Sequence, residues 1–365
     1  MILHLYFVRK FMTSFLLVLA VFFAIIMLVD MVEQIRRFEG DAVGLPEAFQ
    51  LSLLHAPQNL YRILPLLVVL STLAMFLGLA RSSELVVTRA AGRSALRSLW
   101  APVGAALLLG ILGIVAINPI VAATSHQYEQ VTNRYARGEA AVLSVGAEGL
   151  WLRQSGRSGQ MVIHAQRSNL DGTSLYDVNF LAFGDEGQPL WRVDAEAATL
   201  SPGKWQLENA KRWNFDGAGN PERTSLVLPS MVISSNLTRE EIRESFGEPQ
   251  AIPIWELPAF IDRLENAGFS AVQHRVWFWM ELAMPLMLVA MVLIAAGFTM
   301  RHTRFGRTGM MVLFAILLGF GVYFLRTFAQ VLGDNGQIPV LLAAWAPPAA
   351  GILMSLGLLL HTEDG

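Results

Sequence analysis

The chain has no cysteine and few charged residues. Its 365 residues include no cysteine, only 15% are charged, and 54% are hydrophobic. The missing cysteine excludes a disulfide framework, a thiolate metal site and a thiol nucleophile. The net charge of −2 gives no general case for binding nucleic acid. So apolar a composition is typical of a membrane protein rather than of a soluble enzyme.

Motifs of the common catalytic sites are missing as well. There is no G-x-x-x-x-G-K-[ST] phosphate loop, so the chain does not hydrolyse ATP by that route. The seven histidines form no H-E-x-x-H pair, and no G-x-S-x-G nucleophile elbow is present. We therefore expect no metal, no cofactor and no catalytic nucleophile.

Long apolar runs predict six membrane-spanning helices. A spanning helix needs about 20 apolar residues. Such runs lie at 11–29, 63–80, 99–123, 276–300, 309–332 and 338–360. The first run resembles a signal peptide, but its length and the lack of a small-residue cleavage site favour a retained span. A half-apolar pattern at 45–60 predicts a helix near the outer interface, and Asn118-Pro119 predicts a kink or an early end of the third span.

Between the third and fourth spans the sequence changes to short alternating runs separated by turn residues. These runs lie at 150–153, 160–164, 175–180, 190–199, 205–215 and 224–233. The pattern predicts an antiparallel β-sandwich or roll, with Trp191, Trp205 and Trp213 in its core. Connecting helices are expected at 238–247 and at 255–268, the second ending at Gly268. The predicted fold is therefore an α-helical polytopic membrane protein with six transmembrane helices and an inserted all-β domain.

A polar segment between the second and third spans carries helix signals. Ser82 or Ser83 can cap a helix start, and Glu84 then lies in the first turn, where an acid suits the helix dipole. The arginines of this segment are Arg81, Arg89, Arg93 and Arg97. Their spacing in multiples of four places them on one helix face, and arginines between two spans indicate a cytosolic loop. The residues leave two interpretations open: a hairpin that only fixes topology, and a docking segment.

The segment "LARSSELVVTRAAG", preceded by "LYRILPLLVVLSTL" and followed near the end by "LLAAWAPP", resembles the permease subunits of the lipopolysaccharide-export ABC transporter. The resemblance covers nearly the whole chain and is closer to the LptG branch than to the LptF branch. It implies that 81–93 is a coupling helix that docks on a partner ATPase. The coupling residues that it implies are Arg81, Glu84, Leu85, Arg89 and Arg93. It also favours a β-jellyroll-like domain in the periplasm.

Several charges lie at or within the outer ends of the spans. A charge that faces hydrocarbon costs about 2.5–3.5 kcal/mol on insertion scales, so Glu281 and Arg326 are expected to face protein or a wet cavity. One interpretation is a buried Glu281–Arg326 pair that only fixes helix packing. The other is a lipid-binding set at the mouth of a cavity, formed by Arg36, Arg37, Arg62, Arg134, Arg137 and Arg326. Arginine suits a phosphorylated lipid because its planar fork pairs with phosphate at two places.

The resemblance also implies an organisation and a set of partners. Residues 1–137 would hold three spans, 138–250 the β-domain, and 251–365 a connecting helix and three more spans. The expected partners are a sister permease of LptF type, a dimeric cytosolic ATPase of LptB type and a single-span periplasmic bridge protein of LptC type. Lipopolysaccharide would enter a cavity between the first and fifth spans, in a Gram-negative inner membrane. A lipoprotein-releasing permease and a membrane-anchored sensor or scaffold are the alternatives.

Overall fold

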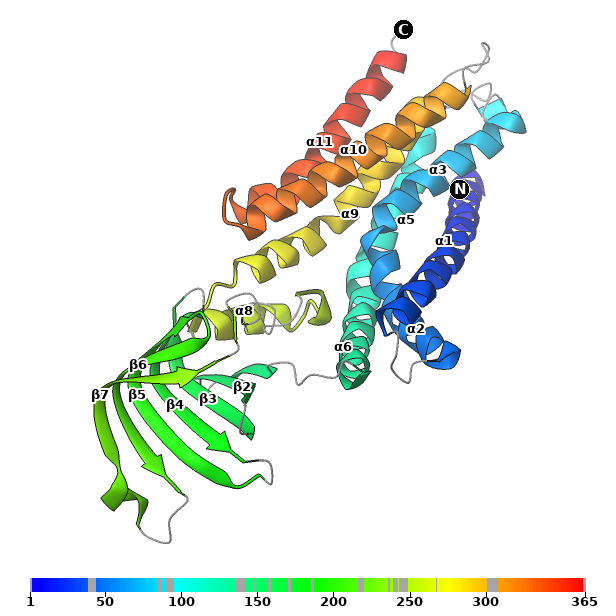
Figure 1. The fold of residues 1–365 in the computed structure, drawn as a ribbon. Coiled ribbons are helices and arrows are strands. Elements are labelled where there is room, and N and C mark those ends of the chain that lie inside the picture. The colour runs from blue at the N-terminus through cyan, green and yellow to red at the C-terminus, as the bar shows by residue number, and fades with distance from the viewer. Residues whose placement is uncertain are drawn as a thin grey trace. The chain divides into compact units, whose positions relative to one another are not determined.

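The structure is a computed structural model that divides into two compact units. It describes residues 2–38, 44–84, 87–88, 95–135, 142–146, 149–156, 159–169, 172–184, 187–215, 220–235, 237–238, 242, 249–266, 268–300 and 308–363. One unit comprises Met1–Tyr135, Gln250–Ile254 and Val272–Gly365, and the other comprises Ala136–Pro249 and Trp255–Ala271. The first holds the long helices and the second holds the sheet (Figure 1).

Within the described residues, six helices of the first unit are long and apolar enough to cross a membrane. The elements of this unit are α1 (Ile2–Arg37), α2 (Leu45–Arg62), α3 (Leu64–Arg81), α5 (Ala95–Leu112), η1 (Gly113–Ile117), α6 (Asn118–Tyr135), α9 (Val272–Thr299), α10 (Thr308–Asp334) and α11 (Val340–Glu363). The six predicted spans are thus confirmed. α1 extends past both ends of its apolar run because the residues there, among them Arg9, Lys10 and Glu33, are good helix formers.

α9 is the central helix of this unit. Of its most apolar window, 83% is buried, and it packs against α3, α5, α10 and α11 (Figure 1). Small residues lie at these contacts: Gly110 of α5 rests against Pro285, and Gly351 of α11 rests against Ala290. Such residues let helices approach closely where lipid supplies no hydrophobic driving force.

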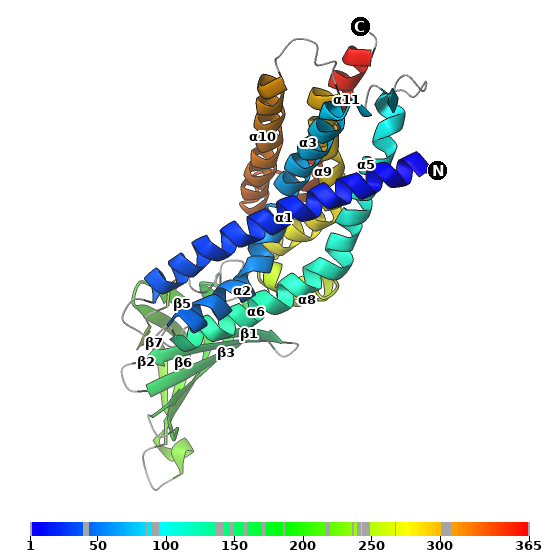
Figure 2. The same cartoon turned by 90° about the vertical axis from the view of Figure 1, so that its right-hand side faces the viewer.

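α1 crosses α3 and α5 at the surface of the unit (Figure 2). Its buried side chains form two groups: Phe7, Phe11 and Phe15 towards its N-terminus, and Met27, Asp30 and Gln34 towards its C-terminus. Spacings of three, four and seven residues place the members of each group on one face, and the twelve-residue step from Phe15 to Met27 turns the second group to another side of the helix. The rest of the helix is largely uncovered, since only 17% of its apolar window is buried.

The third span is one continuous helix that contains a π-helical turn. α5 passes through η1 into α6, and the backbone N–H of Asn118 donates to the carbonyl of Gly113, five residues earlier. Of the two alternatives predicted at Asn118-Pro119, a kink or an early end, the early end is therefore wrong. The wider turn inserts an extra residue just before Pro119, which relieves the clash by which a proline would break a regular α-helix.

The second unit is built on one curved antiparallel sheet of seven strands in the order β1 to β7 (Figure 1). The strands are β1 (Val142–Gly146), β2 (Gly149–Gly156), β3 (Gly159–Ser168), β4 (Ser174–Phe183), β5 (Pro189–Ser201), β6 (Lys204–Asn214) and β7 (Leu226–Ser234). The all-β insert is confirmed. Pairing of each strand with the next is the connectivity of a rolled meander rather than of a two-sheet sandwich. β1 was not predicted because its five residues give too little alternation.

An apolar core covers one face of the sheet. Leu152, Ile163, Phe180 and Val193, on four successive strands, are each no more than 1% exposed. They lie in register with one another across β2 to β5. Residues two apart on a strand face the same side, so this alternation sets which face is buried.

The three tryptophans expected in that core do not all reach it. Trp205 is 0% exposed, whereas Trp191 and Trp213 are only partly buried. Lys211 Nζ lies 4.9 Å from the centroid of the Trp213 ring, a cation–π contact. The expectation for Trp213 is wrong because Asn209 adopts a positive φ of 51°. This irregularity in β6 shifts the alternation by one residue and turns Trp213 to the outer face.

The connecting helix α8 (Leu257–Asn266) belongs to the β unit. It ends before Gly268, whose φ is +90°, as the sequence predicted. The sequence-based division at residue 250 had placed this helix with the last three spans. It packs with the sheet instead. The residue that follows it, Gly268, lies so close to the end of β3 that a side chain there would overlap the carbonyl oxygen of Ser168. Most of the helix expected at 238–247 lies outside the described residues.

Candidate functional site

Glu84, after the second span, is held by two hydrogen bonds. The Tyr6 hydroxyl of α1 donates to Glu84 Oε2 at 2.6 Å, and Ser82 Oγ donates to Oε1 at 2.8 Å. The hydrogen bond from Tyr6 is the main reason that the pKa of Glu84 lies below its usual value of 4.5; Ser82 and the charge of Lys10 lower it further, and partial burial opposes them. Glu84 is thus a fixed, ionised acid that joins the loop to the first span.

The surroundings of Glu84 differ in part from the sequence prediction. Arg81 ends α3 and is exposed. Ser82 closes α3, with its backbone N–H donating to the carbonyl of Gly78 at 3.0 Å. Of the two serines predicted to start the next helix, it is Ser83 whose carbonyl accepts a backbone N–H of that helix, from Val87 at 3.2 Å. Glu84 and Thr88 are helical, and Thr88 Oγ1 donates to the Glu84 carbonyl at 2.7 Å. The other predicted coupling residues, Leu85, Arg89 and Arg93, lie outside the described residues.

Two exposed arginines end the first span. Arg36 pairs with Glu33 one turn earlier at 3.2 Å, and both side chains are more than half exposed. Arg37 lies with one guanidinium nitrogen 3.5 Å from the Tyr128 hydroxyl, a long hydrogen bond. An exposed pair such as Arg36–Glu33 contributes little to stability, about 0–1 kcal/mol. Both guanidinium groups therefore keep most of their capacity to bind an anion.

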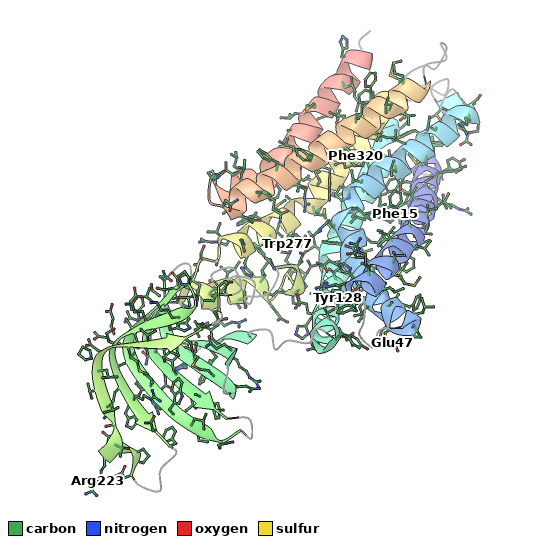
Figure 3. The ribbon with its side chains drawn as sticks, in the orientation of Figure 1. Phe15, Glu47, Tyr128, Arg223, Trp277 and Phe320 are labelled. Atoms are coloured by element: carbon green, nitrogen blue, oxygen red, sulfur yellow. The ribbon has the colours of Figure 1, made fainter. Side chains whose placement is uncertain are left out.

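A buried polar network attaches this end of α1 to α2 and α6. His55 Nδ1 lies 2.7 Å from Asp30 Oδ1, and Gln34 Nε2 donates to the Tyr128 hydroxyl at 2.9 Å. The rings of His55 and Tyr128, a residue of α6 labelled in Figure 3, stack with centroids 4.7 Å apart. Asp30 directly follows the apolar run of the first span. Its partners are distant in the chain, and no local pattern identifies them.

Arg326 points into the helix bundle. It is 7% exposed and lies on the inward stripe of α10. The other residues of this stripe are Ala315, Gly319, Val322, Ala329 and Gly333. Phe320 lies on the exposed face of the same helix (Figure 3) and is 52% exposed. Arg326 is thus a long, charged side chain among the small and apolar residues of a packed interface. Its electrostatic partner must therefore lie within the helix bundle.

Glu281 of α9 is that electrostatic partner. Its side chain is 0% exposed. Oε2 accepts hydrogen bonds from the Tyr61 hydroxyl at 2.5 Å and from Asn118 Nδ2 at 3.5 Å. Oε1 has no hydrogen-bond partner within the described chain, and Arg326 acts on the carboxyl group through its charge rather than through a hydrogen bond. Asn118 also accepts the backbone N–H of Ile254 at 3.0 Å, so this hub joins four segments of the helical unit.

Of the six arginines predicted to gather around a cavity mouth, the structure describes the side chains of four. Arg36, Arg37 and Arg62 are exposed, and Arg326 is buried. Arg62 ends α2, where its carbonyl accepts the hydroxyl of Tyr323 from α10 at 3.3 Å. Arg134 is on α6, but its side chain is not among those described, and Arg137 lies outside the described residues. No group of three or more metal-ligating side chains occurs within the described part of the chain.

The matches to known proteins extend over both units of the chain. The family profile "Lipopolysaccharide export system permease LptF/LptG" matches residues 5–361. The chain is 27% identical over 345 residues to the lipopolysaccharide export system permease protein LptG of Escherichia coli K12. The aligned region covers 92% of this chain and 91% of that protein. It is 22% identical over 353 residues to the LptG protein of Haemophilus influenzae, with 92% of each chain covered. The six spans, the β insert and a profile match over nearly the whole length agree, and the chain belongs to the LptF/LptG family of lipopolysaccharide export permeases.

Proposed function

We propose that this permease subunit extracts lipopolysaccharide from the inner membrane and passes it to a periplasmic bridge of β-domains. The single observation that carries the proposal is the profile match across both the spans and the sheet. The lipid would enter sideways between the first and fifth spans, α1 and α10. Both helices present long apolar faces suited to acyl chains: Leu17 and Phe324, for example, are 67% and 70% exposed.

The subunit would work within a larger assembly. We infer a sister permease of LptF type, a dimeric ATPase of LptB type that hydrolyses ATP, and a bridge protein of LptC type. Copurification in detergent, followed by mass spectrometry of bound proteins and lipids, tests this assembly directly. Recovery of the chain with no ATPase and no lipopolysaccharide would contradict it.

The orientation that the proposal requires has the segment around 81–97 in the cytosol and the sheet in the periplasm. Because the chain has no cysteine, single cysteines are clean labels. Ser94→Cys and Ser155→Cys should react with membrane-impermeant maleimide from opposite sides of the membrane. The cysteine-free parent is the control, and labelling of both variants from one side would contradict the orientation.

Docking of the ATPase is assigned to the segment at 81–93, with Glu84 as its main contact. The carboxylate offers about four lone-pair sites, and Tyr6 and Ser82 use two of them. Glu84 can therefore accept a basic group of the ATPase while it stays joined to α1. Loss of one partner of a buried interfacial charge pair costs about 2–5 kcal/mol, or roughly 30-fold or more in affinity.

Glu84→Ala and Glu84→Gln test this assignment. Both variants should insert normally but recover less ATPase in a pull-down at matched permease levels, and both should lower lipid export. If Glu84 only complements a helix dipole, the change costs about 0.3–1 kcal/mol and ATPase recovery stays normal. Normal recovery and normal export in both variants would remove Glu84 from the interface.

Binding of the lipid phosphates is assigned to Arg36 and Arg37, with Arg62, Arg134 and Arg137 as further members of the set. Arg326 is a weaker candidate for direct contact because it is buried beside Glu281. The double variant Arg36→Glu/Arg37→Glu should lose photocrosslinking to lipopolysaccharide but keep ATPase recovery. Arg223→Glu, at an exposed arginine of the β unit (Figure 3), is the control for the same substitution at a single site outside the set. Unchanged crosslinking in the double variant would leave the pair as membrane-interface anchors.

A further inference from the structure

The first span differs from the other five in its amino-acid composition. Among the six candidate spans of the described chain, Leu3–Arg37 alone contains neither glycine nor proline. Sharp helix kinks occur almost always at proline, at glycine or serine pairs, or at π turns. α1 is a single helix of 36 residues, about 54 Å long at 1.5 Å per residue. From its composition, α1 is therefore expected to behave as a rigid rod without a kink.

The inner end of this rod is joined to the loop that carries Glu84. The Tyr6 hydroxyl donates to Glu84 at 2.6 Å, and Lys10 Nζ lies 5.5 Å from the centroid of the Tyr6 ring. A hydrogen bond to an ionised acceptor is about twice as strong as one between neutral groups. Phe7 and Phe11, of the buried group towards the N-terminus of α1, are 3% and 0% exposed. Movement of Glu84 is thus passed to a helix end that is itself well packed.

The middle of α1 has no fully buried side chain that could hold it in place. Leu16, Leu17, Val21 and Ile25 are 56%, 67%, 50% and 49% exposed in the chain. Val18, Leu19 and Phe22 pack against the helix core but are only partly buried. A displacement at one end is not dissipated along the helix but reaches the other end.

The outer end bears the exposed arginines and is attached by polar contacts. Asp30 and Gln34 are bonded to His55 and Tyr128, as described above. Hydrogen bonds have directional geometry and weaken steeply when misaligned. A shift or rotation of α1 therefore changes these bonds, and with them the position of Arg37, which lies against Tyr128.

We propose that α1 is a rigid lever that carries movement of the ATPase-docking loop to the lipid-binding arginines, and that Tyr6 is the positioning residue that joins the lever to Glu84. This inference rests on the proposed function, because it assigns ATPase docking to Glu84 and phosphate binding to Arg36 and Arg37. Tyr6 is assigned neither to ATP binding nor to lipid binding. Its role is to make the two ends of the subunit move together.

Tyr6→Phe tests the joint. It removes the hydroxyl and keeps the aromatic ring. Thr13→Val is the matched control, since Thr13 is exposed on the same helix and its hydroxyl bonds only within that helix, to the Lys10 carbonyl at 2.9 Å. The full transporter in lipopolysaccharide vesicles is assayed for ATPase recovery, ATP hydrolysis and lipid released. At neutral pH we expect Tyr6→Phe to keep recovery and hydrolysis but to lower lipid released per ATP roughly tenfold or more, the low end of the range for loss of a hydrogen bond to a charged group. Thr13→Val should match wild type.

Softening the rod tests the lever without touching either end. Ala20 and Ala24 are exposed in the middle of α1. Ala20→Gly/Ala24→Gly introduces flexibility, whereas Ala20→Leu/Ala24→Leu keeps strong helix formers at the same sites. The glycine pair should lower lipid released per ATP with ATPase recovery intact, and the leucine pair should not. Because the ends are unchanged, a fold defect would appear as loss of ATPase recovery.

The outcomes separate this inference from the function on which it rests. Wild-type transporter that releases no lipid with ATP would refute the proposed function. Normal lipid release per ATP in both Tyr6→Phe and the glycine pair, beside an active wild type, would overturn the lever alone. Reduced ATPase recovery in Tyr6→Phe would also overturn it, since Tyr6 would then only shape the docking surface.

Discussion

Removal of the Tyr61 hydroxyl should cost far more than the same change at Tyr323. Tyr61 donates to the buried carboxyl group of Glu281 at 2.5 Å, and the other oxygen of that group has no hydrogen-bond partner within the described chain. Tyr323 donates at 3.3 Å to the Arg62 carbonyl at an exposed position. The two Tyr→Phe changes are chemically identical, so the difference between them reports the environment of the hydroxyl.

The magnitude follows from what each change leaves behind. A typical hydrogen bond contributes about 0.5–1.5 kcal/mol net, and a buried acceptor left without its donor costs about 1–3 kcal/mol. For Tyr61→Phe we expect a loss of about 2–3 kcal/mol in the free energy of unfolding. An exposed, long bond lies at the low end of the range for neutral hydrogen bonds, so Tyr323→Phe should cost about 0.5 kcal/mol.

The assay is reversible unfolding of the permease in mixed micelles, titrated with sodium dodecyl sulfate. A double-mutant cycle with Glu281→Leu shows whether the cost passes through the carboxyl group. In the Glu281→Leu background, Tyr61→Phe should become nearly neutral, giving a coupling of at least about 1 kcal/mol between two contacting residues. Equal costs for Tyr61→Phe and Tyr323→Phe, or an unchanged Tyr61→Phe cost without Glu281, would refute the reasoning.

Two further predictions concern the loop and the β unit. The Tyr6 hydroxyl holds the pKa of Glu84 below 4.5, so binding that needs the ionised form is lost only as the pH falls through that lowered pKa. In Tyr6→Phe the pKa of Glu84 moves back up, so ATPase recovery in a pH series should decline at a higher pH than in wild type. A decline at the same pH in both proteins would contradict this. In the β unit, Gly268→Ala should cost about 3 kcal/mol, because φ is +90° and a Cβ would overlap the Ser168 carbonyl. Gly336→Ala, at φ +70° with open space around it, should cost only about 1 kcal/mol in the same unfolding titration; equal losses would show that the overlap is relieved.

Features that depend on local pattern could be predicted from the sequence. The six spans follow from apolar runs long enough to cross a bilayer, and α8 ends at Gly268 as its pattern indicated. The strands from β2 to β7 follow from alternation between turn residues. Glu84 could be singled out because an acid stood at the start of a helix between two spans, and because the segment around it resembles a known family.

The partners of the functional residues could not be predicted in this way. Tyr6 and Glu84 are 78 positions apart in the chain, and Tyr61 and Glu281 are 220 apart. Neither pair has a spacing that marks it, because which side chains meet depends on how whole helices pack and rotate against one another.

Two local surprises have the same origin. The π turn before Asn118 lets a helix continue where a proline pattern predicted a kink or an early end, and the positive φ of Asn209 turns Trp213 out of the core. In both, an irregularity of one residue in the backbone overrides the local pattern. The sequence by itself determined which segments are helices, strands and spans, since these follow from periodicity and length. Only the tertiary structure decided which polar groups are joined, because buried polar groups must take their hydrogen-bond partners from whichever elements the packing brings within reach.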